Sequence, residues 1–121
     1  MEEQPALVRE RCVACCRDAP RVSDGDIVEL QRQIPEWSVR DQDGIPRLER
    51  TFRFKEYRRA LDFTQRIGDL AEAEDHHPAI LTEARRVTVT WWTHAIRGLH
   101  RNDFIMAAKT DSLYDASLHR S

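Results

Sequence analysis

The stretch that decides the fold is residues 37–75, which read WSVRDQDGIPRLERTFRFKEYRRALDFTQRIGDLAEAED. In its first half, residues 37–41 and 45–54 are two extended runs around Asp43-Gly44, and this dipeptide in such a position predicts a β-hairpin. Alternate residues of the second run share a face, which the aromatic rings mark as the buried one: Leu48, Arg50, Phe52 and Phe54.

The second half of the stretch has a different period. From Lys55 to about Asp75, apolar residues recur at spacings of three and four with charged residues between them, the pattern of an amphipathic helix. These residues are Tyr57, Ala60, Leu61, Thr64, Ile67, Leu70 and Ala71. Pro78 cannot continue the helix.

The flanking segments predict four further elements, two of which form a second hairpin. Upstream, Ser23 followed by an acidic first turn predicts a short helix that stops at Pro35. Downstream, residues 79–83 and 86–93 predict two strands, and residues 102–118 contain good helix formers. Two hairpins without a repeated strand-helix-strand crossover indicate an α+β fold, a four-stranded antiparallel sheet with helices packed on one face.

Composition excludes several classes of protein. The 121 residues are 33% charged and 40% hydrophobic, as in an ordinary globular domain, and the formal charge of −2 argues against direct binding of nucleic acid. No apolar run approaches the roughly 20 residues that a membrane span requires, and the acidic start is unlike a signal peptide, so we expect a cytoplasmic protein. We expect residues 1–22 to form a flexible arm that contains cysteines, and residues 23–121 to form one domain.

Ionisable side chains gather where the long helix ends, at Glu72, Asp75, His76 and His77, and again at His94, where the fourth strand ends. If the helix reaches His76, Glu72 lies one turn before it on the same face, where a carboxylate would orient the ring. We expect the three imidazoles to converge on a shared cavity. They suit a reaction that protonates a leaving hydroxyl and removes another proton, and dehydration is such a reaction.

Plainer interpretations exist for the same residues. Taken alone, His76 and His77 fit a helix C-terminus, and His94 fits a polar strand end. A metal site is the other alternative for the three histidines, but no ligand spacing is diagnostic and we expect no metal. Cysteines 12, 15 and 16 resemble half of a zinc site; because the second half is missing, we expect free thiols on the arm.

The motifs around these residues resemble those of the pterin-4a-carbinolamine dehydratases. They are Glu72-x-x-x-His76-His77-Pro78, Val87-Thr88-Val89 running into Trp92-Thr93-His94, and Gly98-Leu99 followed by residues 102–105 and 107–109. The likeness extends upstream through Trp37 and residues 51–55 to 60–61, so that it covers about residues 23–113.

The resemblance implies a hydro-lyase that removes water from a 4a-hydroxytetrahydropterin to give the quinonoid dihydropterin. Pterin is then the substrate, no cofactor is needed, and the protein forms a homodimer or homotetramer. The family's three histidines fall on His76, His77 and His94. We expect His76 and His94 to transfer protons, in either role, and His77 to hold the pterin. Glu72 and Asp103 match acidic positions of the family; at Asp103 we favour a helix capping box.

This chain departs from the family motif at two places. Ala84 stands where the family has an aromatic residue, and loss of a stacking ring could cost on the order of 1 kcal/mol in ligand binding. We expect Ile80 and Trp92 to compensate, and Pro78 to contact the substrate with them. His100 stands where the family has a capping Ser or Thr.

The resemblance also implies an alternative function. Members of this family include mammalian dimerisation cofactors of a homeodomain factor, and assembly factors for RuBisCO associated with carboxysomes. A protein with a weak or inactive site could therefore act on a client protein such as RuBisCO.

Overall fold

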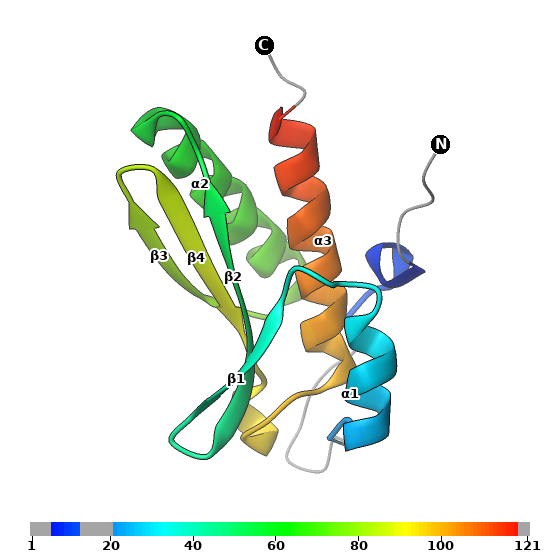
Figure 1. The fold of residues 1–121 in the computed structure, drawn as a ribbon. Coiled ribbons are helices and arrows are strands. Elements are labelled where there is room, and N and C mark those ends of the chain that lie inside the picture. The colour runs from blue at the N-terminus through cyan, green and yellow to red at the C-terminus, as the bar shows by residue number, and fades with distance from the viewer. Residues whose placement is uncertain (1–5, 13–20, 119–121) are drawn as a thin grey trace.

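The sheet and its covering helices are seen in a computed structural model that describes residues 6–12 and 21–118. The elements, in chain order, are η1 (Ala6–Arg9), α1 (Asp24–Gln31), β1 (Ser38–Gln42), β2 (Ile45–Arg53), α2 (Tyr57–Glu74), β3 (Ala79–Glu83), β4 (Arg86–Trp91), η2 (His94–Ile96) and α3 (Arg101–Leu118) (Figure 1). This is the predicted α+β order, with two short 3₁₀ turns added.

Two hairpins lie side by side to make one antiparallel sheet in the order β1-β2-β4-β3. In the first hairpin, both turn residues have positive φ, 56° at Asp43 and 78° at Gly44, which matches the right-handed twist of the paired strands. On the face of β2 that was predicted to be buried, Leu48 and Phe52 are fully enclosed. The hairpin prediction and the assignment of its faces are confirmed.

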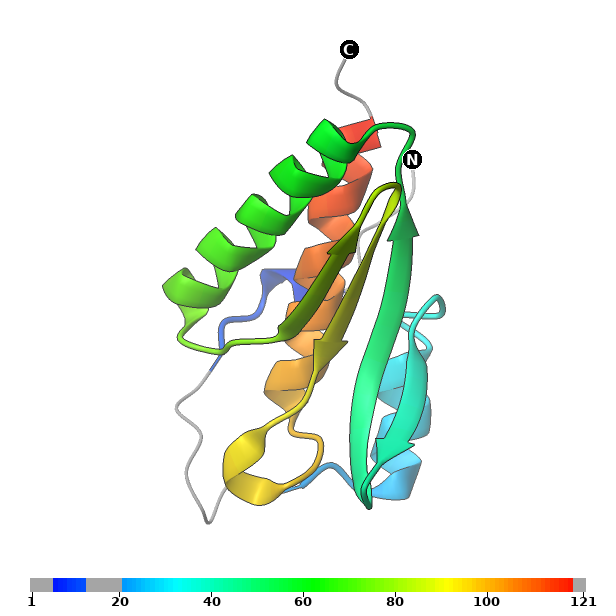
Figure 2. The same ribbon diagram turned by 90° about the vertical axis from the view of Figure 1, so that its left-hand side faces the viewer.

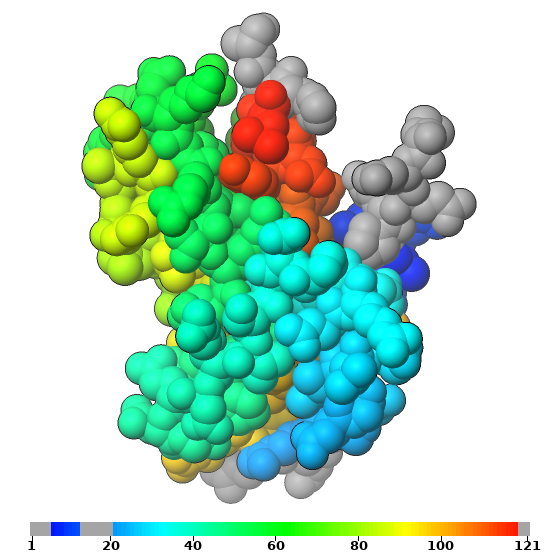
Figure 3. Space-filling model, in the orientation of Figure 1, coloured from blue at the N-terminus to red at the C-terminus, as the bar shows by residue number. Residues whose placement is uncertain are grey.

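The helices cover one face of the sheet, as Figure 2 shows for α2 and α3. Helix α3 is the central element of the molecule: it contacts η1, α2, β2 and β4, and its first half is buried on nearly every side. The apolar core therefore lies between α3 and the inner face of the sheet, with α2 closing one side. In the space-filling view, the two hairpins and α1 form much of the visible surface (Figure 3).

Part of the expected arm is packed rather than loose. Leu7, in η1, is fully buried; the Lys109 amino group donates to the carbonyl of Val8 at 2.9 Å, and Arg101 forms two hydrogen bonds with Glu10. Leu7 and Val8 are two apolar residues without a periodic pattern, so the sequence does not indicate that this segment packs against α3. Of the three cysteines, Cys12 is half-buried and the other two lie outside the described residues.

None of the helices in the described parts of the chain is long and apolar enough to cross a membrane.

Candidate functional site

The end of α2 positions the first two histidines. Asp75 adopts the left-handed conformation, with φ 52° and ψ 44°, and its backbone N–H donates to the last turn of the helix. The next N–H, of His76, donates to the carbonyl of Ala71 at 3.1 Å, which completes a Schellman motif. The helix thus ends before His76, and the chain turns His76 away from the helix face that contains Glu72. Asp75 contributes its backbone to this turn.

His76 is held by a buried carboxylate of α3. Its Nε2 lies 2.7 Å from Oδ1 of Asp103, and the side chain of Asp103 is fully buried. The ring of His76 also stacks on Trp91 at the end of β4, with 5.5 Å between centroids and 14° between planes. An ionised carboxylate only accepts hydrogen bonds, so with Asp103 ionised the proton of this contact lies on Nε2, and Nδ1 is the ring nitrogen that Asp103 does not contact.

Asp103 has two further partners, both at its other oxygen. Oδ2 accepts from the hydroxyl of Thr93 at 2.8 Å and from the backbone N–H of His100 at 2.9 Å. The second bond is the capping contact that the motif predicts for the start of α3. One carboxylate therefore joins the end of β4, the start of α3 and the ring of His76.

His100 completes this cap in an unusual way. Its Nδ1 accepts from the backbone N–H of Asn102 at 3.0 Å, so the imidazole does what a Ser or Thr hydroxyl does at an N-cap. Burial lowers the pKa of His100, and the neighbouring His76 acts in the same direction, whereas Asp103 opposes them. The neutral ring is the form that can accept this bond, because a protonated imidazole has no acceptor nitrogen.

The second histidine of the pair lies outside this cluster. Nε2 of His77 is 2.7 Å from Oε1 of Glu72, and both side chains are largely exposed. The expectation that Glu72 orients His76 is wrong, because α2 ends at Glu74 and the Schellman turn places His77, not His76, beside that carboxylate. Glu72 is thus a surface partner of His77.

His94 begins η2, in a loop that the Thr93–Gly98 bridge closes. The strand β4 ends at Trp91, earlier than predicted. The exposed ring of His94 packs against Trp92 with 4.6 Å between centroids, and the guanidinium of Arg47 covers the same indole at 4.0 Å. The Nε of Arg47 is buried without a hydrogen-bond partner among the described residues, and the cation–π contact gives the guanidinium a favourable neighbour.

Each of the three predicted imidazoles has its own contacts. Within residues 6–12 and 21–118, no hydrogen bond or ring contact joins His94 to His76 or His77. A cavity beside Phe63 and a second beside His100 are lined by other residues. In the same described ranges, no three His, Cys, Asp or Glu side chains are arranged to hold a metal ion.

The residues predicted to wall a pterin pocket also differ in their contacts. Ile80 pairs with buried Val89 and packs against the core on the helix side of the sheet. Trp92 follows Trp91 and packs on His94 and Arg47 instead. Pro78 is half-buried between the histidine pair and β3. Ile80 and Trp92 thus have different contacts, and compensation by either for the missing aromatic stays a prediction.

Sequence reasoning missed Thr93, Trp91 and Arg47 as parts of the site. Thr93 is buried and bonded to Asp103, Trp91 is both core and support for His76, and Arg47 covers Trp92 from β2. For Thr93, the one local signal in the sequence is its position directly before His94, a candidate histidine. The contacts of Trp91 and Arg47 depend on strand pairing and helix docking that no local pattern shows.

Known proteins share this arrangement of elements and motifs. The family model for pterin 4 alpha carbinolamine dehydratase matches residues 20–113. A candidate pterin-4-alpha-carbinolamine dehydratase of Gloeobacter violaceus is 59% identical over 107 residues, which are 88% of this chain and 92% of that protein.

Two solved structures are also similar. A transcriptional coactivator/pterin dehydratase from Brucella melitensis has a TM-score of 0.70 and 31% identity, over 78% of this chain and 98% of that one. A pterin dehydratase-like protein described as a RuBisCO assembly factor in the alpha-carboxysome has a TM-score of 0.54 and 27% identity, over 64% of this chain and 89% of that one. By sequence and by fold, the chain belongs to the pterin 4 alpha carbinolamine dehydratase family.

Proposed function

We propose that this protein removes water from a 4a-hydroxytetrahydropterin by proton transfer between imidazoles and substrate. The observation that supports this most directly is the 2.7 Å contact between Nε2 of His76 and the buried carboxylate of Asp103. A carboxylate that fixes one ring nitrogen leaves the other to exchange a proton, which is the arrangement that general acid–base catalysis needs.

The reaction balances without a metal or a redox cofactor. The 4a-hydroxyl takes a proton and departs as water, N5 loses its proton to a base, and a C4a=N5 double bond forms. His76 is one proposed proton carrier, through Nδ1. The other is His94, which directly follows Thr93, and Thr93 binds the same carboxylate that holds His76. His77, exposed and paired with Glu72, is proposed to hold the pterin.

A dehydratase assay on 4a-hydroxytetrahydropterin tests this proposal. Removal of a general acid or base typically costs about 10²–10⁴-fold in rate, so we expect such losses in His76→Ala and His94→Ala. Glu36→Gln, which removes an exposed carboxylate outside the histidine cluster, is the control, and it should retain most of the activity. Wild-type protein that does not exceed the uncatalysed rate would contradict the proposal.

A second candidate function is assembly of another protein, and a specific observation favours it. The solved relative described as a RuBisCO assembly factor shares this fold at 27% identity, with a TM-score of 0.54. If wild type is inert as a dehydratase, co-expression with RuBisCO subunits should raise the yield of assembled enzyme. His76→Ala should then support assembly as well as wild type does.

A further inference from the structure

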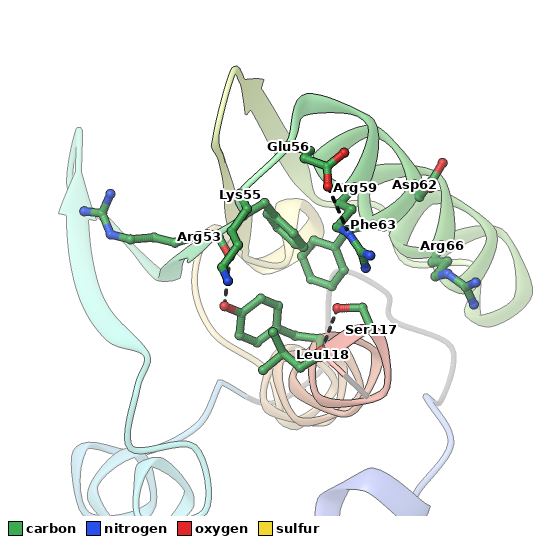
Figure 4. A pocket seen from close by; sticks show the side chains of 11 residues that line it. Arg53, Lys55, Glu56, Arg59, Asp62, Phe63, Arg66, Ser117 and Leu118 are labelled. Atoms are coloured by element: carbon green, nitrogen blue, oxygen red, sulfur yellow. Dashed lines mark hydrogen bonds and ion pairs between the residues drawn. The ribbon is translucent and has the colours of Figure 1, made fainter. Parts of the chain in front are cut away.

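A cavity of about 580 Å³ lies at the opposite end of α2 from His76. It is formed where β2 runs into the start of α2 and where the last turns of α3 pass beside them (Figure 4). An 18-residue helix is ~27 Å long, so this cavity is separate from the histidine cluster. Its volume is in the range of small-molecule sites, roughly 300–1,000 Å³.

The floor of the cavity is aromatic and rigid. The rings of Phe54, Phe63 and Tyr114 contact one another, with centroids 5.3 to 5.7 Å apart. The Tyr114 hydroxyl donates to the backbone carbonyl of Arg53 at 2.9 Å, which fixes its ring and satisfies its polar end. The cavity therefore offers an apolar planar ring a surface on which it can stack.

Cations surround this floor. Arg59 and Arg66 stand seven residues apart on α2, on the same side of the helix as Phe63, and Lys55 comes from the turn before it (Figure 4). Lys55 and the half-buried Arg66 have no ion-pair partner in the described parts of the chain, and Arg59 reaches Glu56 only at 3.8 Å. A partly buried guanidinium without a carboxylate is poorly compensated in the empty cavity.

Two other features add to the positive potential. Helix α2 begins at this cavity with no acidic residue in its first turn, and the side chain of its N-cap residue, Glu56, makes no capping hydrogen bond, so the first N–H groups of the helix remain donors there. In Figure 4, the carboxylate of Asp62 points outward from the helix, away from the rings. The guanidinium of Arg53 also points away, and in this view Lys55 and Arg59 lie nearest the rings, with Arg66 farther along α2.

We propose that this cavity binds a small anion that carries an apolar ring, such as an aryl phosphate or an aromatic carboxylate. The ring would stack on the aromatic floor, and the anionic group would lie between Lys55, Arg59 and the start of α2. Tight binding needs both contacts. An anion without a ring contacts only the cations at the solvated rim, and a neutral ring contacts only the aromatic floor and leaves the cations without a partner. This proposal does not depend on dehydratase activity.

Titration of the full chain with phenyl phosphate, followed by calorimetry and by amide NMR, tests the proposal. We expect saturable binding, with shifts concentrated at residues 53–59, 63–66 and 114–118. Methyl phosphate, which has the anion without the ring, and benzyl alcohol, which has the ring without the anion, should each bind at least tenfold more weakly. No saturation with phenyl phosphate, or equal binding of methyl phosphate, would overturn the proposal.

Matched variants locate the binding on the protein. Lys55→Gln and Arg59→Gln should each weaken phenyl phosphate binding about tenfold, because each removes a charge-assisted contact. Arg58→Gln removes the same charge from an exposed position of α2 that does not line the cavity, and it should change the affinity less than twofold. An equal loss in all three variants would show a general charge effect and would contradict a built site.

Discussion

Two histidine–carboxylate pairs of the same length stand next to each other in this protein and differ in their surroundings. Each has 2.7 Å between Nε2 and a carboxylate oxygen. In the His76–Asp103 pair the side chains are 11% and 0% exposed, whereas in the His77–Glu72 pair they are 57% and 79% exposed. Water screens the second pair and offers each of its groups other partners, so equal distances do not mean equal energies.

The two carboxylates also differ in how much they connect. Asp103 binds three groups from separate parts of the chain: the His76 ring, the Thr93 hydroxyl and the His100 backbone. Glu72 binds His77, five residues away. Loss of Asp103 therefore leaves several buried donors unpaired at once, and loss of Glu72 frees one exposed ring.

The largest expected effect comes from Asp103→Ala. We expect the free energy of unfolding to fall by about 3 kcal/mol, because removal of one partner leaves the buried donors of His76, Thr93 and His100 unsatisfied. Urea unfolding followed by tryptophan fluorescence measures this loss. A decrease below about 1 kcal/mol would show that water replaces the carboxylate and that the contrast between the two pairs is weak.

A pH-dependent effect is expected next, at His100. Burial lowers its pKa in the folded state below the ordinary 6.5, so the unfolded chain takes up the proton first. Stability from the neutral cap is thus present above pH 6.5 and is lost as the pH falls below that value.

Replacement of the imidazole by a hydroxyl isolates the pH-dependent contribution of the His100 cap to stability. His100→Thr retains an N-cap acceptor that does not titrate. Between pH 7.5 and 5.5, we expect the melting temperature of wild type to fall by a few degrees more than that of His100→Thr. Parallel melting curves for the two proteins across this range would contradict a titrating cap.

A smaller effect is expected where Arg47 covers Trp92. Partly exposed cation–π contacts contribute about 0.5–1 kcal/mol, so Arg47→Gln should lower the free energy of unfolding by that amount. It should also change the emission of Trp92, which loses its cationic cover. Arg40→Gln, on the exposed β1 strand, is the matched control and should leave both readouts nearly unchanged.

The smallest effect is expected from Glu72→Ala. An exposed ion pair is worth roughly 0–1 kcal/mol, and we expect a change of less than about 0.5 kcal/mol here. The same urea unfolding assay that follows Asp103→Ala measures it. Equal destabilisation by both variants would remove the distinction between the buried and the exposed pair.

The fold could be predicted from local sequence to a large extent. The Asp43-Gly44 turn, the alternation along β2 and the helical period of residues 57–74 each depend on neighbours within a few positions, and all three agree with the structure. The predicted end of β4, at Thr93, lies two residues beyond the observed end at Trp91. In the sequence, Trp92 and Thr93 continue the alternation of the strand, but the chain turns into η2 directly after them. Docking of Leu7 on the core could not be seen at all.

The candidate site shows where local reasoning fails. The motif placed His76, His77 and Asp103 among the residues to examine, and the capping contact of Asp103 follows from its spacing to His100. The expectation that Glu72 lies beside His76 assumes that the helix continues two residues beyond Glu74, to His76. The left-handed turn at Asp75 instead places His77 beside Glu72, and residue spacing alone does not predict this turn.

By itself, the sequence determined the elements, the buried face of the sheet and the residues able to exchange protons, because these depend on the period of apolar positions and on side-chain chemistry. Only the tertiary structure decided which histidine is fixed. Asp103 reaches His76 across 27 positions of the chain once α3 packs against the sheet and the end of α2. Burial then makes that contact strong, since water cannot compete for a carboxylate that packing has enclosed.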